Sequence, residues 1–95
     1  MSRSTVRLRL YVAGAAPHSR RAMANLRSFC DRHLPEDCDV EVIDLFTRPE
    51  RALEDMVLLT PTLMILEPLP VRSVVGDLGE PSILLDMLST ERTTR

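Results

Sequence analysis

The stretch Val-Arg-Leu-Arg-Leu-Tyr-Val at residues 6–12 determines the first element of the fold. Apolar side chains recur at every second position, namely Val6, Leu8, Leu10 and Val12. The intervening positions hold Arg7, Arg9 and Tyr11. A period of two is typical of a β-strand with one buried face. The small residues and the proline at 13–17 then predict a loop.

An amphipathic helix is predicted next, from Pro17 or His18 to about His33. One stripe of the helix collects side chains at spacings of three and four, namely Ala22, Leu26, Phe29, Cys30 and His33. The helix should end at Leu34, because a residue that precedes proline is pushed out of helical geometry. The polar residues 35–39 predict a turn.

The rest of the chain predicts three more strands and two more helices. We expect strands at 40–45 and 71–75, and between them a turn into a further strand within 60–66. A short helix should follow Thr47, which can cap it with Glu50 three residues later, and should end between Met56 and Leu58. A last helix should begin at Asp77 or Glu80 and end near Leu88, and residues 89–95 predict a frayed tail.

This order, β-α-β-α-β-β-α, is the thioredoxin-like α/β layout, with a mixed sheet between helices. The 95 residues are enough for one domain, which we expect to span 1–95 and to be ordered from about 5 to 88. Such a small core gives marginal stability, so we also expect a homo-oligomer, a dimer or tetramer, when the protein is free.

Composition excludes several classes of function. The formal net charge is −2 and the aromatic residues are only Tyr11, Phe29 and Phe46, which argues against nucleic-acid binding. No apolar run approaches the ~20 residues that span a bilayer, and the N-terminus lacks the apolar region of a signal peptide. These features predict a cytoplasmic protein without a membrane association.

No residue pattern supports catalysis, a metal site or a cofactor. Thioredoxin-like enzymes carry a reactive cysteine where the first helix begins, and residues 13–20 contain none. Cys30 and Cys38 match neither a C-x-x-C motif nor zinc spacing, so we expect free, packed thiols. His18 and Ser19 lack a third group to orient the base of a hydrolase. The prediction is a protein that is not an enzyme.

The tripeptide Thr60-Pro61-Thr62 precedes the predicted third strand. In the thioredoxin layout a proline at this place is typically cis, and its peptide bond shapes the substrate-facing surface. X-Pro bonds adopt the cis form at little cost. We therefore expect a cis bond at Pro61, with an ordinary trans turn as the alternative.

Short segments in a fixed order resemble the KaiB family over roughly residues 6 to 88. They are Leu10-Tyr11-Val12-Ala13-Gly14, Pro17, Ser19, Val42-Ile43-Asp44, Glu54-Asp55, Thr60-Pro61-Thr62-Leu63, Pro68-Leu69-Pro70-Val71-Arg72 and Gly76-Asp77-Leu78. Each segment is weak alone, and together at these separations they are specific.

The resemblance implies a regulatory protein that binds a KaiC-type ATPase and, in clock-bearing cyanobacteria, helps to sequester KaiA. The family is metamorphic: its C-terminal half refolds between a tetrameric ground state and a monomeric thioredoxin-like state that binds the ATPase. A structure of this chain can thus show either fold. We assign the hinge of such a switch to Gly76, Asp77, Pro61, Pro68 and Pro70, and partner binding to Glu54, Asp55, Met56, Thr60 and Arg72.

Two departures from clock-type members favour a relative outside the cyanobacterial clock. Met56 stands where those members commonly carry lysine, and residues 91–95, Glu-Arg-Thr-Thr-Arg, replace an acidic tail. We predict a non-enzymatic regulator in a clock or clock-derived system. The alternative is a stress-response or sensor-type module, similar to the domain at the N-terminus of clock-associated histidine kinases.

Overall fold

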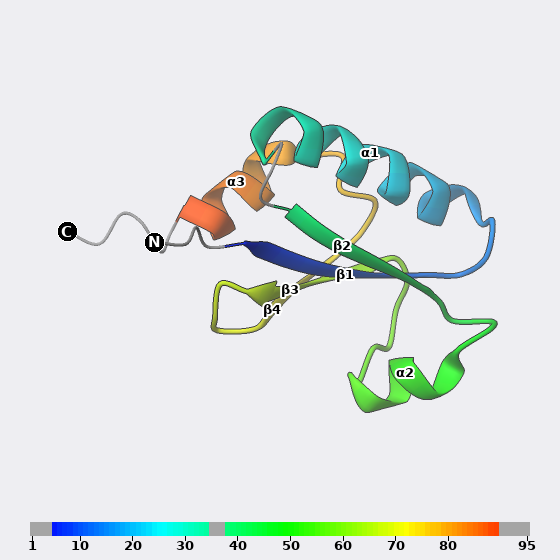
Figure 1. Cartoon of the computed structure of the whole chain (residues 1–95). Coiled ribbons are helices and arrows are strands. Elements are labelled where there is room, and N and C mark those ends of the chain that lie inside the picture. The colour runs from blue at the N-terminus through cyan, green and yellow to red at the C-terminus, as the bar shows by residue number, and fades with distance from the viewer. Residues whose placement is uncertain (1–4, 35–37, 90–95) are drawn as a thin grey trace.

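The computed structural model describes residues 5–34 and 38–89. The elements follow the predicted thioredoxin-like order, and not that of a rearranged C-terminal half (Figure 1). They are β1 (Val6–Val12), α1 (Pro17–His33), β2 (Cys38–Asp44), α2 (Pro49–Glu54), β3 (Thr62–Glu67), β4 (Arg72–Val75) and α3 (Pro81–Ser89).

The four strands form one mixed sheet in the order β2-β1-β3-β4. β1 is parallel to β2, with Leu10 opposite Val42, and antiparallel to β3, with Leu10 opposite Leu63. β4 pairs antiparallel with the other side of β3. β1 is thus flanked by strands on both sides, and its alternation places side chains on both faces of the sheet.

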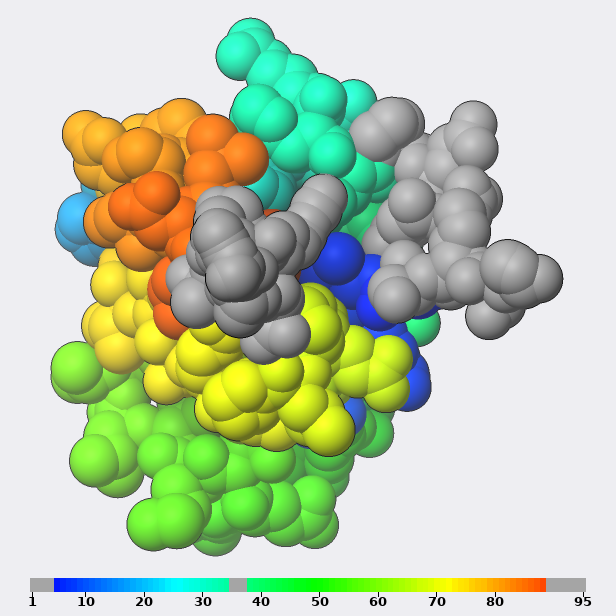
Figure 2. Space-filling model, turned by 90° about the vertical axis from the view of Figure 1, so that its left-hand side faces the viewer, coloured from blue at the N-terminus to red at the C-terminus, as the bar shows by residue number. Residues whose placement is uncertain are grey.

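Helices cover the two faces unequally (Figure 1). α1 and α3 lie over one face, where the larger core collects buried residues of β1, α1, β3 and α3: Leu8, Leu10, Val12, Ala22, Leu26, Phe29, Leu63, Ile65 and Leu84. α2 lies on the other face, where Tyr11, Ile43 and Ala52 form a smaller core. In the space-filling view, the turn between β3 and β4 (yellow) separates α3 (orange) from α2 (green) (Figure 2).

Several predicted boundaries were wrong. Cys38 and Asp39 belong to β2 and not to a turn, because they pair with Val6 and Arg7 in the parallel ladder. Thr47 does not cap α2: its hydroxyl donates to the Asp44 carbonyl, and the residue before the helix is Arg48. The predicted tail begins at Ser89, which is the last residue of α3, and 90–95 lie outside the described residues.

The end of the predicted short helix and the end of the apolar stripe on α1 also need correction. α2 ends at Glu54, before the expected Met56, whose φ of 58° is left-handed and does not continue a helix. His33 closes α1 as an exposed residue, with its ring centroid 4.8 Å from that of Phe29, and does not belong to the buried stripe.

Ser19 has a structural role in the first turn of α1. The side chain is 1% exposed, and its Oγ accepts a hydrogen bond from the Ala13 amide at 2.9 Å. This bond ties the loop after β1 to the start of α1. Ser19 is thus a residue of the first helical turn, as the sequence predicted.

We predict that Ser19→Ala lowers the free energy of unfolding by about 1 to 3 kcal/mol, because it leaves the Ala13 amide without its partner. Urea denaturation followed by circular dichroism measures the change. Ser28→Ala on the exposed side of α1 is the control and should stay within about 0.5 kcal/mol of the wild type. Equal midpoints for both variants would contradict this role.

Candidate functional site

A group of exposed apolar side chains lies where the chain leaves α2 and runs toward β3. Met56 is 81%, Leu58 91%, Leu59 61% and Val75 57% exposed. These four residues line one open groove, of about 260 Å³, beside β3 and β4. We call them the α2–β3 apolar surface. Contiguous exposed apolar groups of this kind mark contact sites for other proteins.

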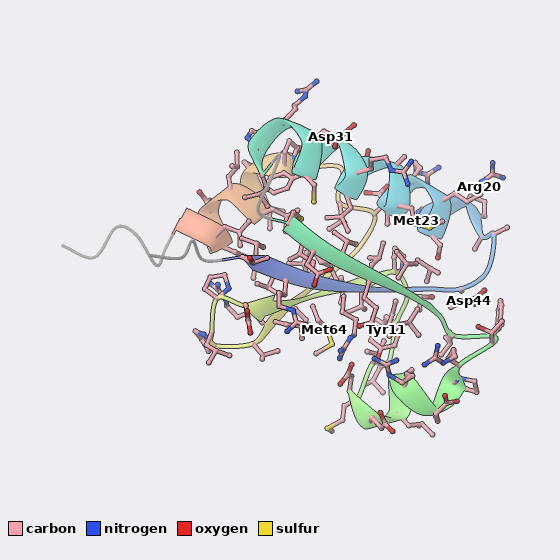
Figure 3. The ribbon with its side chains drawn as sticks, in the orientation of Figure 1. Tyr11, Arg20, Met23, Asp31, Asp44 and Met64 are labelled. Atoms are coloured by element: carbon pink, nitrogen blue, oxygen red, sulfur yellow. The ribbon has the colours of Figure 1, made fainter. Side chains whose placement is uncertain are left out.

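A polar network holds α2 against the sheet beside this surface. Tyr11 is 0% exposed, and its hydroxyl lies 2.6 Å from Asp55 Oδ2 and 2.8 Å from the Arg51 carbonyl oxygen. Arg9 Nη1 donates to the same Asp55 oxygen at 3.0 Å. Figure 3 shows Tyr11 and Met64 on the side of the sheet that faces α2. Asp55 at the end of α2 is therefore fixed by two side chains of β1.

Glu41 of β2 extends the network. Its Oε1 accepts from Arg9 Nε at 2.9 Å, and its Oε2 accepts from Arg51 Nη2 at 3.2 Å. Two arginines and two carboxylates thus alternate around the buried phenol. Every carboxylate has a cationic donor, which satisfies charges that lie partly out of water.

The network shifts the pKa values of its members. Burial alone would raise the pKa of Asp55, but hydrogen bonds from Tyr11 and Arg9 outweigh it and hold that pKa below its ordinary value. Burial, with the Asp55 hydrogen bond, raises the pKa of Tyr11 to about 12. The Arg9 hydrogen bond lowers the pKa of Glu41. At neutral pH the carboxylates are charged and the phenol keeps its proton.

Two of the five predicted hinge residues meet at one end of the β3–β4 pair. The Gly76 amide donates to the Pro61 carbonyl at 2.9 Å, and the Thr60–Pro61 bond is cis, as predicted. Gly76 has a φ of 126°, a conformation that other residues rarely adopt. Pro68 and Pro70 also follow cis bonds but lie in the turn at the opposite end, so the structure does not bring them to Gly76.

Asp77 ties the segment after β4 to α1. Its Oδ2 accepts from Arg21 Nε at 3.2 Å, its Oδ1 from the Gly79 amide, and its carbonyl from Asn25 Nδ2. The hydrogen bond from Arg21, with that from Gly79, lowers the pKa of Asp77. Gly76 and Asp77 therefore form the junction between the sheet, α1 and the start of α3.

The predicted partner-binding residues separate into two places. Glu54, Asp55, Met56 and Thr60 lie along α2 and the segment after it, with Glu54 and Met56 exposed, Thr60 half-buried and Asp55 engaged in the network. Arg72 lies opposite Ile65 on the other face of the sheet, where its Nη1 donates to the Met87 carbonyl at 2.8 Å. Arg72 is not part of the same site.

Sequence reasoning missed most of the surface itself. Leu58, Leu59 and Val75 are exposed, and the sequence predicted no surface role for any of them. The signal available in the sequence was the pair Leu58-Leu59 directly before Thr60-Pro61, which belongs to no helix or strand. The roles of Arg9 and Arg51 were also missed, because their partners are distant in sequence.

Other chemistry has little support among the described residues. Within 5–34 and 38–89 no group of three or more His, Cys, Asp or Glu side chains is arranged to hold a metal ion. None of the helices in this part of the chain is long and apolar enough to cross a bilayer. Cys30 and Cys38 are free, half-buried thiols.

Comparison with known proteins places these features in a family. Residues 9–90 match the KaiB domain. The chain is 41% identical to the "Circadian clock oscillator protein KaiB" of Prochlorococcus marinus (strain MIT 9312), with 97% of this chain and 90% of that protein covered.

Solved structures support the fold. The N-terminal domain of Synechococcus elongatus SasA superposes with a TM-score of 0.80 at 14% identity, covering 100% of this chain and 92% of that one. Oxidised mitochondrial thioredoxin 3 of Saccharomyces cerevisiae superposes with a TM-score of 0.73 at 16% identity. The match covers 93% of this chain and 80% of that one. The fold is thioredoxin-like.

We predict that Asp55→Asn lowers the free energy of unfolding by about 2 kcal/mol at pH 7, because the charged acceptor of Tyr11 and Arg9 is lost. A folded-state pKa below the unfolded one means that the Asp55 contribution is present above the unfolded pKa and is lost as pH falls through the folded pKa. The stabilities of the two proteins should therefore begin to converge as the pH falls below about 4.

Urea titrations at pH 7 and pH 3 measure this convergence. Glu54→Gln is the control, since Glu54 is exposed and its only described partner is Arg51 Nε at 3.9 Å. A deficit for Asp55→Asn that is the same at both pH values would show that the charge of Asp55 is not what holds α2.

We predict that Gly76→Ala destabilises the described fold by about 1 to 3 kcal/mol through backbone strain at φ 126°. A Cβ at this position would meet no atom within 4 Å, so crowding does not contribute. Chemical denaturation measures the loss, with Ser73→Ala on the exposed side of β4 as the control. An unchanged midpoint for Gly76→Ala would rule out the strain.

Proposed function

Because this chain belongs to the KaiB family, we propose that it is a non-enzymatic regulatory protein that binds a KaiC-type ATPase in a circadian clock or a clock-derived signalling system. The observation that carries the proposal is the likeness to clock oscillator proteins at 41% identity over nearly the full chain. A cytoplasmic location and self-association of the free protein are part of the same proposal.

The α2–β3 apolar surface is the docking site in this proposal. Complete burial of a leucine or methionine side chain contributes about 1.5 to 3 kcal/mol. Leu58 and Met56 keep most of their surface in water in the free chain, so a partner that covers them gains much of that free energy. A few such side chains supply most of the affinity of a typical interface.

The rim of this surface indicates what the partner should offer. Glu54 is exposed at the end of α2, whereas the neighbouring carboxylate of Asp55 is already neutralised by Arg9. An apolar pocket with a basic group beside it would complement both features. Met56, which replaces the lysine common in clock-type members, makes this surface more apolar than a lysine would.

The junction at Gly76 and Asp77 is the proposed hinge. A change of the C-terminal half must break the Gly76–Pro61 backbone bond and the contacts of Asp77 with Arg21 and Asn25. These contacts hold the junction between β4 and α3, in addition to the core packing of Leu84 and the pairing of β3 with β1. Two packings of one chain need differ by only a few kcal/mol for a switch.

A second candidate function is favoured by the likeness to the SasA N-terminal domain at a TM-score of 0.80. In this alternative the chain is a sensor-type or stress-response interaction module that acts without a clock. The two candidates differ in their partner: only the first requires binding of the isolated chain to a KaiC-type ATPase.

We predict that Leu58→Arg weakens binding to the KaiC-type ATPase of the same organism at least tenfold, because it places a charge in an apolar interface. Affinity is measured by size exclusion and by surface plasmon resonance in the presence of ATP. Leu69→Arg is the matched control, since Leu69 is 68% exposed in the β3–β4 turn, away from the surface.

Two outcomes would count against the proposal in different ways. Wild-type affinity in Leu58→Arg would remove the α2–β3 apolar surface from the interface while leaving the partner in place. Absence of binding by the wild-type chain itself would remove the ATPase as the partner and favour the second candidate.

A further inference from the structure

Cys30 and Cys38 lie together although eight residues separate them. Their Sγ atoms are 2.7 Å apart, compared with about 2.05 Å in a disulfide. Cys30 is in the last turn of α1 and Cys38 is the first residue of β2. Both pack against the larger core. The two sulfur atoms therefore lie about 0.7 Å beyond the length of a disulfide bond.

We propose that Cys30 and Cys38 are a redox-modification site, which forms a reversible intramolecular disulfide by exchange with a low-molecular-weight disulfide such as oxidised glutathione. The site joins α1 to β2 and lies apart from the α2–β3 apolar surface. It does not depend on the proposed ATPase partner.

The reaction balances as a thiol–disulfide exchange. One protein thiolate attacks a sulfur of the small disulfide and releases a small thiolate, which takes up a proton. The second protein thiol then loses its proton and attacks the mixed disulfide, which releases the other small thiol. Two protein thiols are oxidised, one small disulfide is reduced to two thiols, and the two protons end on those thiols.

Burial and the contact between the two thiols shift the pKa of each cysteine. Burial, together with the hydrogen bond to Cys38 and the nearby Asp31, raises the pKa of Cys30 to about 12. Burial also raises the pKa of Cys38, with a contribution from Asp39, but the hydrogen bond with Cys30 acts in the opposite direction. Either thiol can therefore be the first nucleophile, with the other as the resolving thiol.

The surroundings admit a small reagent. Cys30 lines an open groove of about 280 Å³ between α1 and β2, together with Met23, Leu26, Val40 and Val42. Met23 and Asp31 lie along this side of α1 in Figure 3. The thiolates are scarce at neutral pH, so exchange is slow, and the pair responds to the sustained redox poise and not to a brief pulse of oxidant.

The disulfide would link α1 covalently to β2. It closes a ring of nine residues, 30 to 38, which restricts the unfolded chain. For a domain of this size the expected rise in Tm is about 10 °C. In the cytosol such a bond is uncommon as a permanent feature and typical of redox sensing, which agrees with a reversible one.

The test incubates the wild-type chain for hours in glutathione buffers of increasing oxidised fraction, followed by alkylation and intact-mass spectrometry. The expected product has lost two hydrogens, carries no glutathione and no alkyl group, and returns to two alkylated thiols after dithiothreitol. Its Tm should exceed that of the reduced chain by about 10 °C.

Cys30→Ser and Cys38→Ser are the matched variants. Each should stop at the mixed disulfide with one glutathione and show no rise in Tm. Two alkylatable thiols in the wild-type chain under full oxidation, two bound glutathiones, or dimers linked between chains would each overturn the proposal. These readouts use the wild-type chain, so poor folding of a variant does not weaken them.

Discussion

The buried hydroxyl of Tyr11 determines where α2 packs on the sheet. β1 lies inside the sheet between β2 and β3, and helices cover both of its faces. Leu8, Leu10 and Val12 pack in the larger core with α1, while Tyr11 packs in the smaller core with α2. A phenol out of water needs a hydrogen-bond partner, because an unsatisfied polar group costs about 1 to 3 kcal/mol. The Arg51 carbonyl and Asp55 supply it. The position of α2 follows from that requirement more than from apolar contact, since Ala52 is its only buried residue.

With α2 held by these polar contacts, the helix is short and the apolar residues that follow it stay exposed. The helix has six residues, ends where Asp55 turns inward, and continues into Met56 at a positive φ. The chain then passes Leu58 and Leu59 in no regular element before it enters β3. The network holds this segment at Asp55, and beyond it Val57 packs against the smaller core while Leu58 and Leu59 stay exposed. The exposed surface proposed for partner binding is thus a consequence of polar anchoring on the adjacent strand.

Local periodicity in the sequence was sufficient to predict the order of the elements. It did not predict contacts between residues that are distant in the sequence. The alternation in 6–12 predicted β1, and the proline at 61 predicted the cis bond before β3. Cys38 and Asp39 look like turn residues because they follow Pro35-Glu36-Asp37, yet pairing with Val6 and Arg7 makes them strand. Tyr11 occupies a position that the alternation assigns to the charged side, and only the arrival of α2 buries it. Arg72 was grouped with Met56 by the family resemblance, whereas strand register places it on the opposite face.

The proposed disulfide and the proposed docking surface occupy different halves of the chain. Cys30 and Cys38 join α1 to β2, which with β1 form the N-terminal half, whereas the apolar surface belongs to the segment after α2 and to β4. The halves meet through β1–β3 pairing, the Tyr11 network and the Asp77 contacts with α1. A disulfide would make the N-terminal half more rigid. It would not change the contacts of the Gly76 junction. Oxidation would therefore stabilise the half against which the C-terminal half packs, without blocking either the surface or the hinge.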